Sequence, residues 1–355
     1  MTEPTPDFSL AMVPKAGVRP WREHGYRLEG SPSATNPSKY IVHNYGHGGA
    51  GITLSWGVAS QVCDLVRDRA SVTGDTKVAV LGSGAIGLTA ATLIRDLGLN
   101  VTVYTKEFWQ DTTSHVAGGQ WSPSSVKYNS TSKFKAVLKS AYRRFESDIG
   151  KGFGVSKKIN YTPERDPYLD LVVSLVPGLI PAPQPINLPF QHLTKPGFKY
   201  ETLLIETSIF LNKLDGDLRA KNVSFEQKTF EDVDDVLDLQ ENIIVNCTGL
   251  GARDIWRDWD VKGIKGHLAV LTAQPNLTYL FSRDGYLFPR QDGVIIGGTY
   301  RFGDETTNPE PAVSKQLVDH MKGVFGVGPV VPLPTFHIDH PNNKDLISTE
   351  EVVVS

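Results

Sequence analysis

The chain has few cysteines and no long apolar run, and both absences limit what it can be. Among its 355 residues only Cys63 and Cys247 carry thiols, and both lie in apolar stretches, which favours reduced core residues over a disulfide or a metal site. No stretch approaches the roughly 18 uninterrupted apolar residues of a transmembrane helix, and the N-terminus lacks the basic start and apolar run of a signal peptide. We therefore expect a cytoplasmic protein that does not span a membrane.

An excess of either charge is also absent. The sequence contains 36 Lys and Arg residues against 39 Asp and Glu residues, which gives a formal charge of -3. A balance of this kind offers no general basic surface for nucleic acid, so we expect no nucleic-acid partner. Hydrophobic residues at 40% and charged residues at 21% are typical of a globular protein, and the length suits one large or two ordinary domains.

The strongest motif is a strand, a tight turn, a helix and a second strand in close succession. Residues 77–81 form a short apolar run typical of a buried parallel strand, residues 88–97 have helical spacing, and residues 100–104 form the next apolar run. The turn reads Gly-Ser-Gly-Ala-Ile-Gly, which fits the GxGxxG pattern of dinucleotide-binding proteins in its required structural context. This segment therefore predicts a dinucleotide site.

Each glycine of the motif has a physical reason. Gly82 allows the tight turn, Gly84 lets the backbone approach a pyrophosphate, and Gly87 lets helix and strand pack closely. The helix N-terminus then faces the phosphates with its positive end. These glycines and Ile86 are the first candidate cofactor-binding residues.

The end of the second strand departs from the usual pattern. An acidic residue is expected there to hold the ribose hydroxyl, but the sequence has Lys106 followed by Glu107. Glu107 could substitute, or Lys106 could contact a phosphate. This loop alone does not separate NAD from FAD.

A second glycine-rich segment precedes the first motif. Residues 41–59, which begin Ile-Val-His-Asn-Tyr-Gly-His-Gly-Gly, resemble the segment that closes chains of the D-amino acid oxidase family. Residues 16–20, Ala-Gly-Val-Arg-Pro, resemble the family's Gly-Phe-Arg-Pro, which lies shortly before that segment. In the family the nucleotide motif comes first, so the inverted order implies a circular permutation. Residues 1–74 would then be the family's C-terminal portion moved to the front, with residues 68–75 joining the old termini.

The resemblance implies an α/β fold with a doubly wound, Rossmann-like FAD-binding domain and an interleaved antiparallel-sheet substrate domain. The expected FAD-binding domain takes residues 40–125 and 200–260, with a helical pattern over 201–214. The expected substrate domain takes residues 1–39, 126–199 and 261–325. Residues 326–355 form a tail whose role we do not assign, and a homodimer is an open expectation. The chain ends Val-Val-Val-Ser, which is not the C-terminal peroxisomal address of many relatives.

The segment 111–123 is similar to the family's second flavin segment and favours FAD as the cofactor. By that similarity the hydroxyls of Thr113 and Ser114 would meet the pyrophosphate, and Gly119 would place a backbone N–H along the flavin ring. Gln120 stands where the family usually has an apolar residue, so its polar side chain would lie near the ring. From composition alone the segment is equally a Ser- and Thr-rich loop.

The family resemblance also assigns the substrate contacts. Arg19 would bind the substrate carboxylate in a bidentate fork, Tyr286 would add its hydroxyl, and the carbonyl of Gly49 would accept a hydrogen bond from the amine. Three further residues would lie along the flavin: Gly48, Gly51 and Thr53, the last through its hydroxyl or its backbone. His43 and His47 are interpreted as structural residues and not as general bases.

The implied reaction is FAD-dependent oxidative deamination of a D-amino acid by O₂, giving a 2-oxo acid, ammonia and H₂O₂. Two enzyme alternatives stay open: a D-aspartate oxidase, in which Arg283 would meet a side-chain carboxylate, and an oxidase of glycine or another small amine. A non-enzymatic alternative is a flavin-binding protein without turnover. A nicotinamide dehydrogenase would leave the segments 41–59 and 111–123 without a role.

Overall fold

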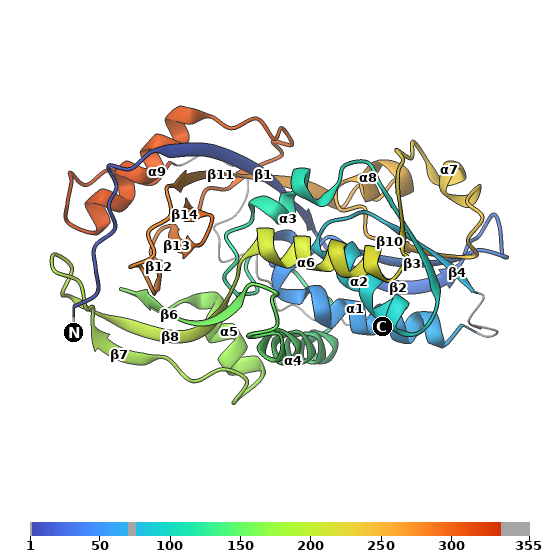
Figure 1. The fold of residues 1–355 in the computed structure, drawn as a ribbon, viewed down its shortest axis with the longest axis horizontal. Helices are drawn as coiled ribbons and strands as arrows, with labels where there is room; N and C mark the ends of the chain where they lie inside the picture. The colour runs from blue at the N-terminus through green and yellow to red at the C-terminus, as the bar shows by residue number, and fades with distance from the viewer. Residues whose placement is uncertain (1, 70–75, 335–355) are drawn as a thin grey trace.

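The computed structural model describes residues 2–69 and 76–334, and these residues form two sheets joined by long strands (Figure 1). The proposed permutation linker, 68–75, and the tail, 326–355, therefore lie largely outside the described residues. None of the helices described is both long and apolar enough to cross a membrane. Both the α/β class and the dinucleotide-binding strand–turn–helix order are confirmed.

The first sheet has six strands and carries the nucleotide motif. Its strands, in spatial order, are β2 (Arg27–Pro32), β3 (Tyr40–Tyr45), β10 (Ile243–Asn246), β4 (Lys77–Leu81), β5 (Asn100–Thr105) and β9 (Ser224–Gln227). All neighbours are parallel except β2, which is antiparallel to β3. Strands β4 and β10 are buried on both faces, as an apolar strand inside a parallel sheet must be.

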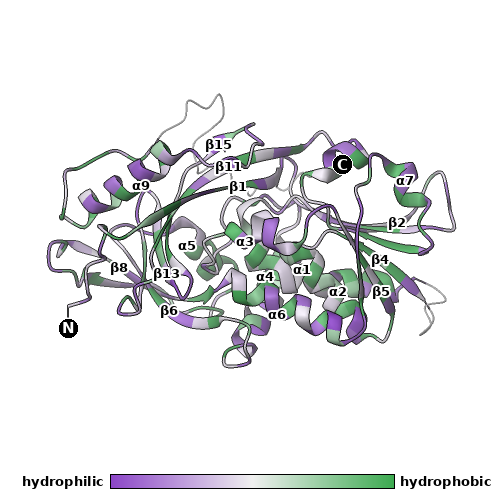
Figure 2. Cartoon of the chain, turned by 45° about the horizontal axis from the view of Figure 1, so that its top comes forward, coloured by the Kyte–Doolittle hydropathy of each residue, from purple (hydrophilic) through white to green (hydrophobic). Residues whose placement is uncertain are grey.

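Helices cover both faces of this sheet. The larger layer contains α1 (Gly51–Arg67), α2 (Ala85–Asp96), α4 (Thr131–Ser147) and α6 (Thr207–Ala220), which share one apolar core with β4 and β5. The opposite face packs against α7 (Val233–Leu237) and α8 (Gly251–Trp256). Figure 2 shows α1 and α2 largely apolar, whereas α6 and α9 (Pro311–Val324) carry polar residues.

Helix α4 illustrates how sequence sets these packing faces. Ser130 caps its N-terminus by accepting a hydrogen bond from the backbone N–H of Lys133. Its buried side chains follow at helical spacing, from Phe134 through Val137 and Leu138 to Phe145. The apolar stripe of α4 therefore lies on the core, next to α1.

The second sheet is largely antiparallel and has nine strands. Along its main path they are β1 (Met12–Arg22), β11 (Val261–Leu271), β14 (Gly293–Gly297), β13 (Tyr286–Arg290), β12 (Leu280–Ser282), β6 (Val155–Thr162), β8 (Pro196–Ile205) and β7 (Gln184–Asn187), with β15 (Arg301–Phe302) beside β11. Helix α9 (Pro311–Val324) packs on β11 and β14, and α5 (Pro167–Leu175) follows β6. Strand β1 runs along this sheet and leads toward the first one (Figure 1).

Two details differ from the sequence expectations. The first sheet includes β2, which lies inside the range 1–39 assigned to the substrate domain. The helical pattern over 201–214 is wrong in its first part, because residues 201–205 pair with β6 as the end of β8 and α6 starts only at Thr207. The division into two domains stays a prediction.

Candidate cofactor and substrate site

A cavity of about 1160 Å³ takes its walls from both sheets. All but one of the predicted site residues line it: Arg19, Gly48, Gly49, Gly51, Thr53, Gly82, Gly84, Ile86, Thr113, Ser114, Gly119, Gln120 and Tyr286. The exception is Gly87, which lies behind the turn. Segments far apart in the sequence are thus brought to one place.

The turn between β4 and α2 leaves a helix N-terminus open to this cavity. Gly82 has φ of +108°, a conformation that suits glycine, and Gly84 is an N-cap without a side chain. A Cβ built on Gly87 would lie only 2.0 Å from the carbonyl oxygen of Gly82. Because the first turn of α2 has no acidic residue, its positive end is free to attract an anion such as a pyrophosphate.

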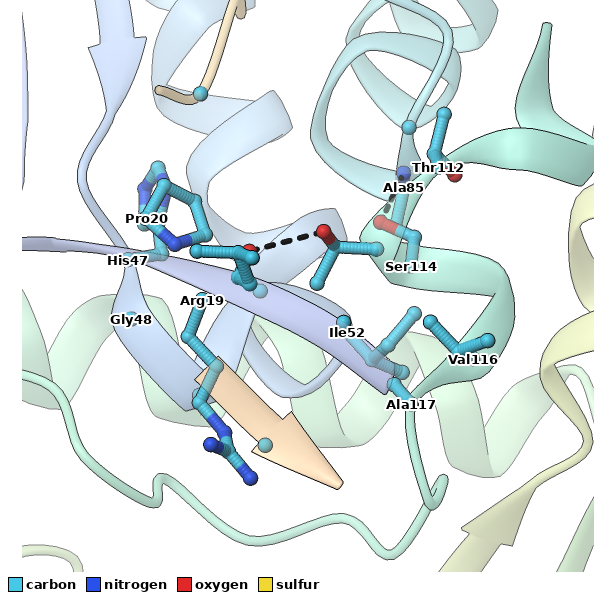
Figure 3. A pocket seen from close by; sticks show the side chains of 18 of the residues that line it. Arg19, Pro20, His47, Gly48, Ile52, Ala85, Thr112, Ser114, Val116 and Ala117 are labelled. Atoms are coloured by element: carbon cyan, nitrogen blue, oxygen red, sulfur yellow. Dashed lines mark hydrogen bonds between the residues drawn. The ribbon is translucent and has the colours of Figure 1, made fainter. Parts of the chain in front are cut away.

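The hydroxyls of Thr113 and Ser114 are both used inside the protein. Thr113 Oγ1 donates to the carbonyl oxygen of Val18 on β1 (2.9 Å), and Ser114 Oγ accepts from the backbone N–H of Ala85 (3.0 Å), as Figure 3 shows for Ser114. The proton of the Ser114 hydroxyl stays available to an acceptor beside the α2 terminus. The Thr113 hydroxyl instead links α3 (Thr113–Val116) to β1, and its proton is already used in this bond. Its predicted contact with the pyrophosphate stays a prediction and would require this bond to break.

The turn η1 (Gly48–Ala50) and the start of α1 form another wall. Gly48 has φ of +56°, and a Cβ there would lie 1.9 Å from the carbonyl oxygen of Ser125. A Cβ on Gly51, by contrast, would meet nothing within 4 Å. The Thr53 hydroxyl is occupied, because it donates to the carbonyl oxygen of Ser122 (2.8 Å) and accepts from the same residue's N–H (3.1 Å). The Thr53 hydroxyl therefore has no proton left to donate but keeps one acceptor lone pair, and both predicted Thr53 contacts stay predictions.

Four residues of the cavity wall carry buried polar atoms that have no hydrogen-bond partner within the described protein. They are the Nε2 atom of His47, the Oδ1 atom of Asn44, the Nε2 atom of Gln120 and the Nε atom of Arg283. A buried polar atom without a hydrogen bond costs about 1–3 kcal/mol, so a polar ligand in this cavity would relieve the cost. The N-terminus of α2 suits the phosphates of a flavin dinucleotide, and the polar atoms without partners can hydrogen bond to the edge of its flavin ring.

The two histidines of the 41–59 segment are neutral near pH 7. Burial lowers the pKa of His43 to about 3, and burial lowers the pKa of His47 to about 3 as well. His43 does not line the cavity, and its Nδ1 lies 3.2 Å from the side-chain nitrogen of Asn246. The ring of His47 stacks on Tyr26 at 5.0 Å. These contacts support the structural interpretation of both residues.

Arg19 presents an uncompensated positive charge to the cavity. No carboxylate lies within ion-pair distance of it in the part of the chain that the structure describes. Its Nη1 donates to the carbonyl oxygen of Thr299 (3.1 Å), and its guanidinium lies over the ring of Tyr300 at 4.6 Å. Gly266 on β11 makes room for it, because a Cβ there would lie 2.6 Å from Nη1 and Nη2. The other guanidinium donors can therefore receive an anion.

Tyr286 and Tyr300 lie beside this cation, and Tyr168 lines the same cavity. Tyr286 stacks on Phe288 at 4.3 Å, and burial raises the pKa of Tyr286 to about 12 against the opposing effect of Arg19. Burial also raises the pKa of Tyr168 well above its ordinary value, and the neighbouring Tyr300 adds to that shift. The phenols of Tyr286 and Tyr168 therefore stay protonated at neutral pH and can donate hydrogen bonds. Sequence reasoning missed Tyr168 and Tyr300 as site residues.

Arg283 lines the same cavity from the hairpin between β12 and β13. Its Nε is buried without a hydrogen bond, and it lies 3.7 Å from a carboxylate oxygen of Asp284. Lys106 and Glu107 line the cavity too, and the carbonyl oxygen of Glu107 accepts from Ser83 Oγ (2.9 Å). The structure thus places Arg283, Lys106 and Glu107 in the cavity wall. Their contacts with substrate or cofactor stay predictions.

Known proteins resemble this chain in sequence over most of its length. A family model described as FAD dependent oxidoreductase matches residues 77–167 and 198–338, well over half of the chain. A D-amino-acid oxidase from Streptomyces coelicolor is 27% identical over 252 residues, which cover 69% of this chain and 76% of that protein.

Solved structures show the same fold at low sequence identity. An L-amino acid deaminase from Proteus vulgaris has a TM-score of 0.53 at 12% identity and covers 73% of this chain and 76% of its own. A glycine oxidase from Bacillus cereus has a TM-score of 0.52 at 13% identity, with coverage of 70% and 77%. At these identities the likeness concerns the fold alone.

Proposed function

Because this chain belongs to the family of FAD-dependent oxidoreductases, we propose that it oxidises D-amino acids to 2-oxo acids, with release of ammonia and H₂O₂. The observation that carries the proposal is Arg19, a cation without a carboxylate partner in the described protein, in a cavity that fits a flavin dinucleotide. The curated relatives named D-amino-acid oxidase support the choice of D-amino acids.

The carboxylate of the substrate would be held by Arg19. A guanidinium offers a planar fork of N–H donors that matches a carboxylate in bidentate fashion. Its stacking on Tyr300 and its bond to the Thr299 carbonyl fix the plane of the fork before the substrate arrives. Tyr286 adds a protonated hydroxyl as a further donor.

The amine would be held by the carbonyl of Gly49. That oxygen already accepts a long bond from Ser124 Oγ (3.4 Å), and a carbonyl has a second lone pair for the substrate. Burial lowers the pKa of both His43 and His47 to about 3, so neither imidazole is basic enough to take a proton from the substrate ammonium group. The substrate would therefore react with its amine already neutral.

FAD, when bound, supplies the redox chemistry by taking a hydride equivalent from the substrate Cα and passing two electrons to O₂ to give H₂O₂. The protein orients the Cα–H bond, since Arg19 and Gly49 fix the two ends of the amino acid. The released imino acid takes up water and yields the 2-oxo acid and ammonia.

Acidic D-amino acids are a second candidate class. The specific observation is Arg283, whose side chain lines the cavity and whose Nε has no hydrogen-bond acceptor, the Asp284 carboxylate lying 3.7 Å away. A substrate with a second carboxylate would supply that acceptor. The variant Arg283→Ala should then lower kcat/KM for D-aspartate while leaving D-alanine unchanged; an equal loss on both would assign Arg283 to the fold of the hairpin instead.

The proposal is tested by O₂ uptake and H₂O₂ formation with D-alanine, D-methionine, D-aspartate and glycine, each beside its L-form where one exists. Turnover of D-forms alone supports it. Turnover of glycine alone would favour a small-amine oxidase, and turnover of L-forms would contradict the stereochemistry. A yellow protein that oxidises none of them would be a flavin-binding protein without turnover.

We also infer that the chain is a circular permutant of the family. The family match begins at residue 77, and the strand before it, β3, adds to the sheet parallel to β10 and leads into α1 beside α2. Such an exchange costs little when the old termini lie close together at the surface.

A further inference from the structure

The C-terminal arm, residues 329–334, folds back along helix α9. His320 Nδ1 donates to the carbonyl oxygen of Val331 (2.7 Å), and Gln316 Nε2 donates to that of Pro332 (3.2 Å). Positions 316 and 320 are four residues apart, so both side chains leave the same face of α9. Two hydrogen bonds from one helix face thus fix the path of the arm.

Gly323 permits this close approach. A Cβ built on Gly323 would lie 2.6 Å from the carbonyl oxygen of Pro329 and 2.9 Å from Val330 Cα. Glycine inside a helix is about 1 kcal/mol less favourable than alanine, and Gly323 belongs to the last turn of α9. The contact with the arm gives a physical reason for glycine at this position.

Leu333 brings the arm to the cavity. Its half-buried side chain lines the cavity that holds Arg19 and Tyr286. It also fills the space beside Gly285: a Cβ built there would lie 3.4 Å from Leu333 Cδ1 and 3.3 Å from Met321 Cε. Gly285 directly precedes Tyr286 and closes the hairpin between β12 and β13. An apolar side chain from the far end of the chain therefore stands next to the proposed carboxylate site.

We propose that Leu333 is an apolar wall of the substrate pocket and limits the size of the substrate side chain. This inference rests on the proposed function, in which Arg19 and Gly49 fix the carboxylate and amine of the substrate. With both polar ends fixed, the side chain extends to the remaining walls, and the arm supplies one of them through Leu333. The arm acts by shape and apolar contact and takes no part in the chemistry.

The test uses simple carboxylates, which bind without turnover. Acetate, butanoate, benzoate and indole-3-acetate are titrated into the FAD-loaded protein, and binding is followed by the change in the flavin absorbance band. The variants are Leu333→Trp, Leu333→Ala and Gly323→Ala, the last displacing the arm. Val330→Trp and Val330→Ala are matched controls, because Val330 lies in the same arm and is 90% exposed.

We expect the Leu333 and Gly323 variants to change the ratio of the affinities for long and short carboxylates. Leu333→Trp should weaken indole-3-acetate and benzoate by about tenfold or more while acetate changes less than about twofold, the scale on which pocket walls discriminate apolar groups. Leu333→Ala and Gly323→Ala should both raise the affinity for indole-3-acetate relative to that for acetate. The Val330 variants should leave every affinity unchanged.

Two negative results are distinguishable. If carboxylates bind and depend on Arg19, but the long-to-short ratio is the same in the Leu333 and Gly323 variants, the arm does not shape the pocket while the proposed function stands. If no carboxylate perturbs the flavin of the unmodified protein, the proposed substrate site itself is wrong, and the role of Leu333 falls with it.

Discussion

Replacing Arg19 by alanine removes the charged contact that holds the substrate carboxylate in the proposed orientation. In the structure the guanidinium is held by the Thr299 carbonyl and the Tyr300 ring, and its charge has no carboxylate partner in the described residues. A substrate carboxylate would receive two charge-assisted hydrogen bonds, each with a net contribution of about 1.5 kcal/mol or more. The sum of about 3 kcal/mol corresponds to a loss of about 10²-fold in kcat/KM.

The assay is the initial rate of O₂ uptake against D-alanine concentration, with FAD content measured on the same samples after gel filtration. FAD should stay bound, because the phosphate end of the cavity at α2 is untouched. Arg19→Lys keeps the charge without the planar fork and should retain part of the activity. Lys15→Ala removes an exposed cation from the same strand and should change nothing. An Arg19→Ala protein with unchanged kcat/KM would refute the assignment.

Three further predictions concern the fold and the cofactor site. Gly87→Ala should lose FAD on gel filtration, because its Cβ would lie 2.0 Å from the Gly82 carbonyl oxygen; retention of FAD would contradict this. Gly57→Ala should destabilise the protein by about 1–3 kcal/mol in urea unfolding, since its Cβ would lie 2.2 Å from the Val137 carbonyl oxygen where α1 meets α4. Burial lowers the pKa of His43 to about 3 from its ordinary 6.5, so the unfolded chain binds the extra proton between these values. The free energy of unfolding should therefore fall as pH falls below 6.5, by up to about 1.4 kcal/mol per pH unit from this residue. If a His43→Gln variant loses stability with pH as steeply as the unmodified protein, His43 is not the buried neutral group that causes the loss.

Local patterns were enough to predict the core of the nucleotide site. The apolar run at 77–81 became β4 with the predicted bounds, and the glycines after it open the N-terminus of α2 to the cavity. Strand periodicity, turn glycines and helix spacing all act within some twenty residues, so they are readable from one segment. The resemblance of residues 41–59 and 111–123 to a known family then placed distant residues in one cavity.

Side-chain partners could not be predicted in the same way. The Thr113 hydroxyl bonds Val18 and the Thr53 hydroxyl bonds Ser122, so groups expected at the cofactor also join segments of the protein. These bonds depend on tertiary contacts between residues 69 to 95 positions apart. Leu333 was equally hidden, because nothing in its local sequence indicates that α9 returns the chain to the cavity.

The strand at 201–205 shows a third kind of failure. Helical spacing over 201–214 was real only from Thr207 onward, and residues 201–205 pair with residues 155–159 of β6. Pairing with a neighbouring strand outweighs a weak local helical pattern, since propensity is a small energy compared with sheet hydrogen bonding and burial. The break falls at Glu206, which is extended and precedes the helix.

We propose that this flavoprotein removes a hydride equivalent from the Cα of a D-amino acid whose carboxylate is held by Arg19. The most direct measurement is anaerobic mixing of the FAD-loaded protein with D-alanine or L-alanine while the absorbance band of oxidised flavin is followed. We expect D-alanine but not L-alanine to bleach the flavin band, and we expect this bleaching to be much slower in Arg19→Ala. H₂O₂ should form when air is readmitted. Bleaching by L-alanine at an equal rate, or at an unchanged rate in Arg19→Ala, would contradict the proposal.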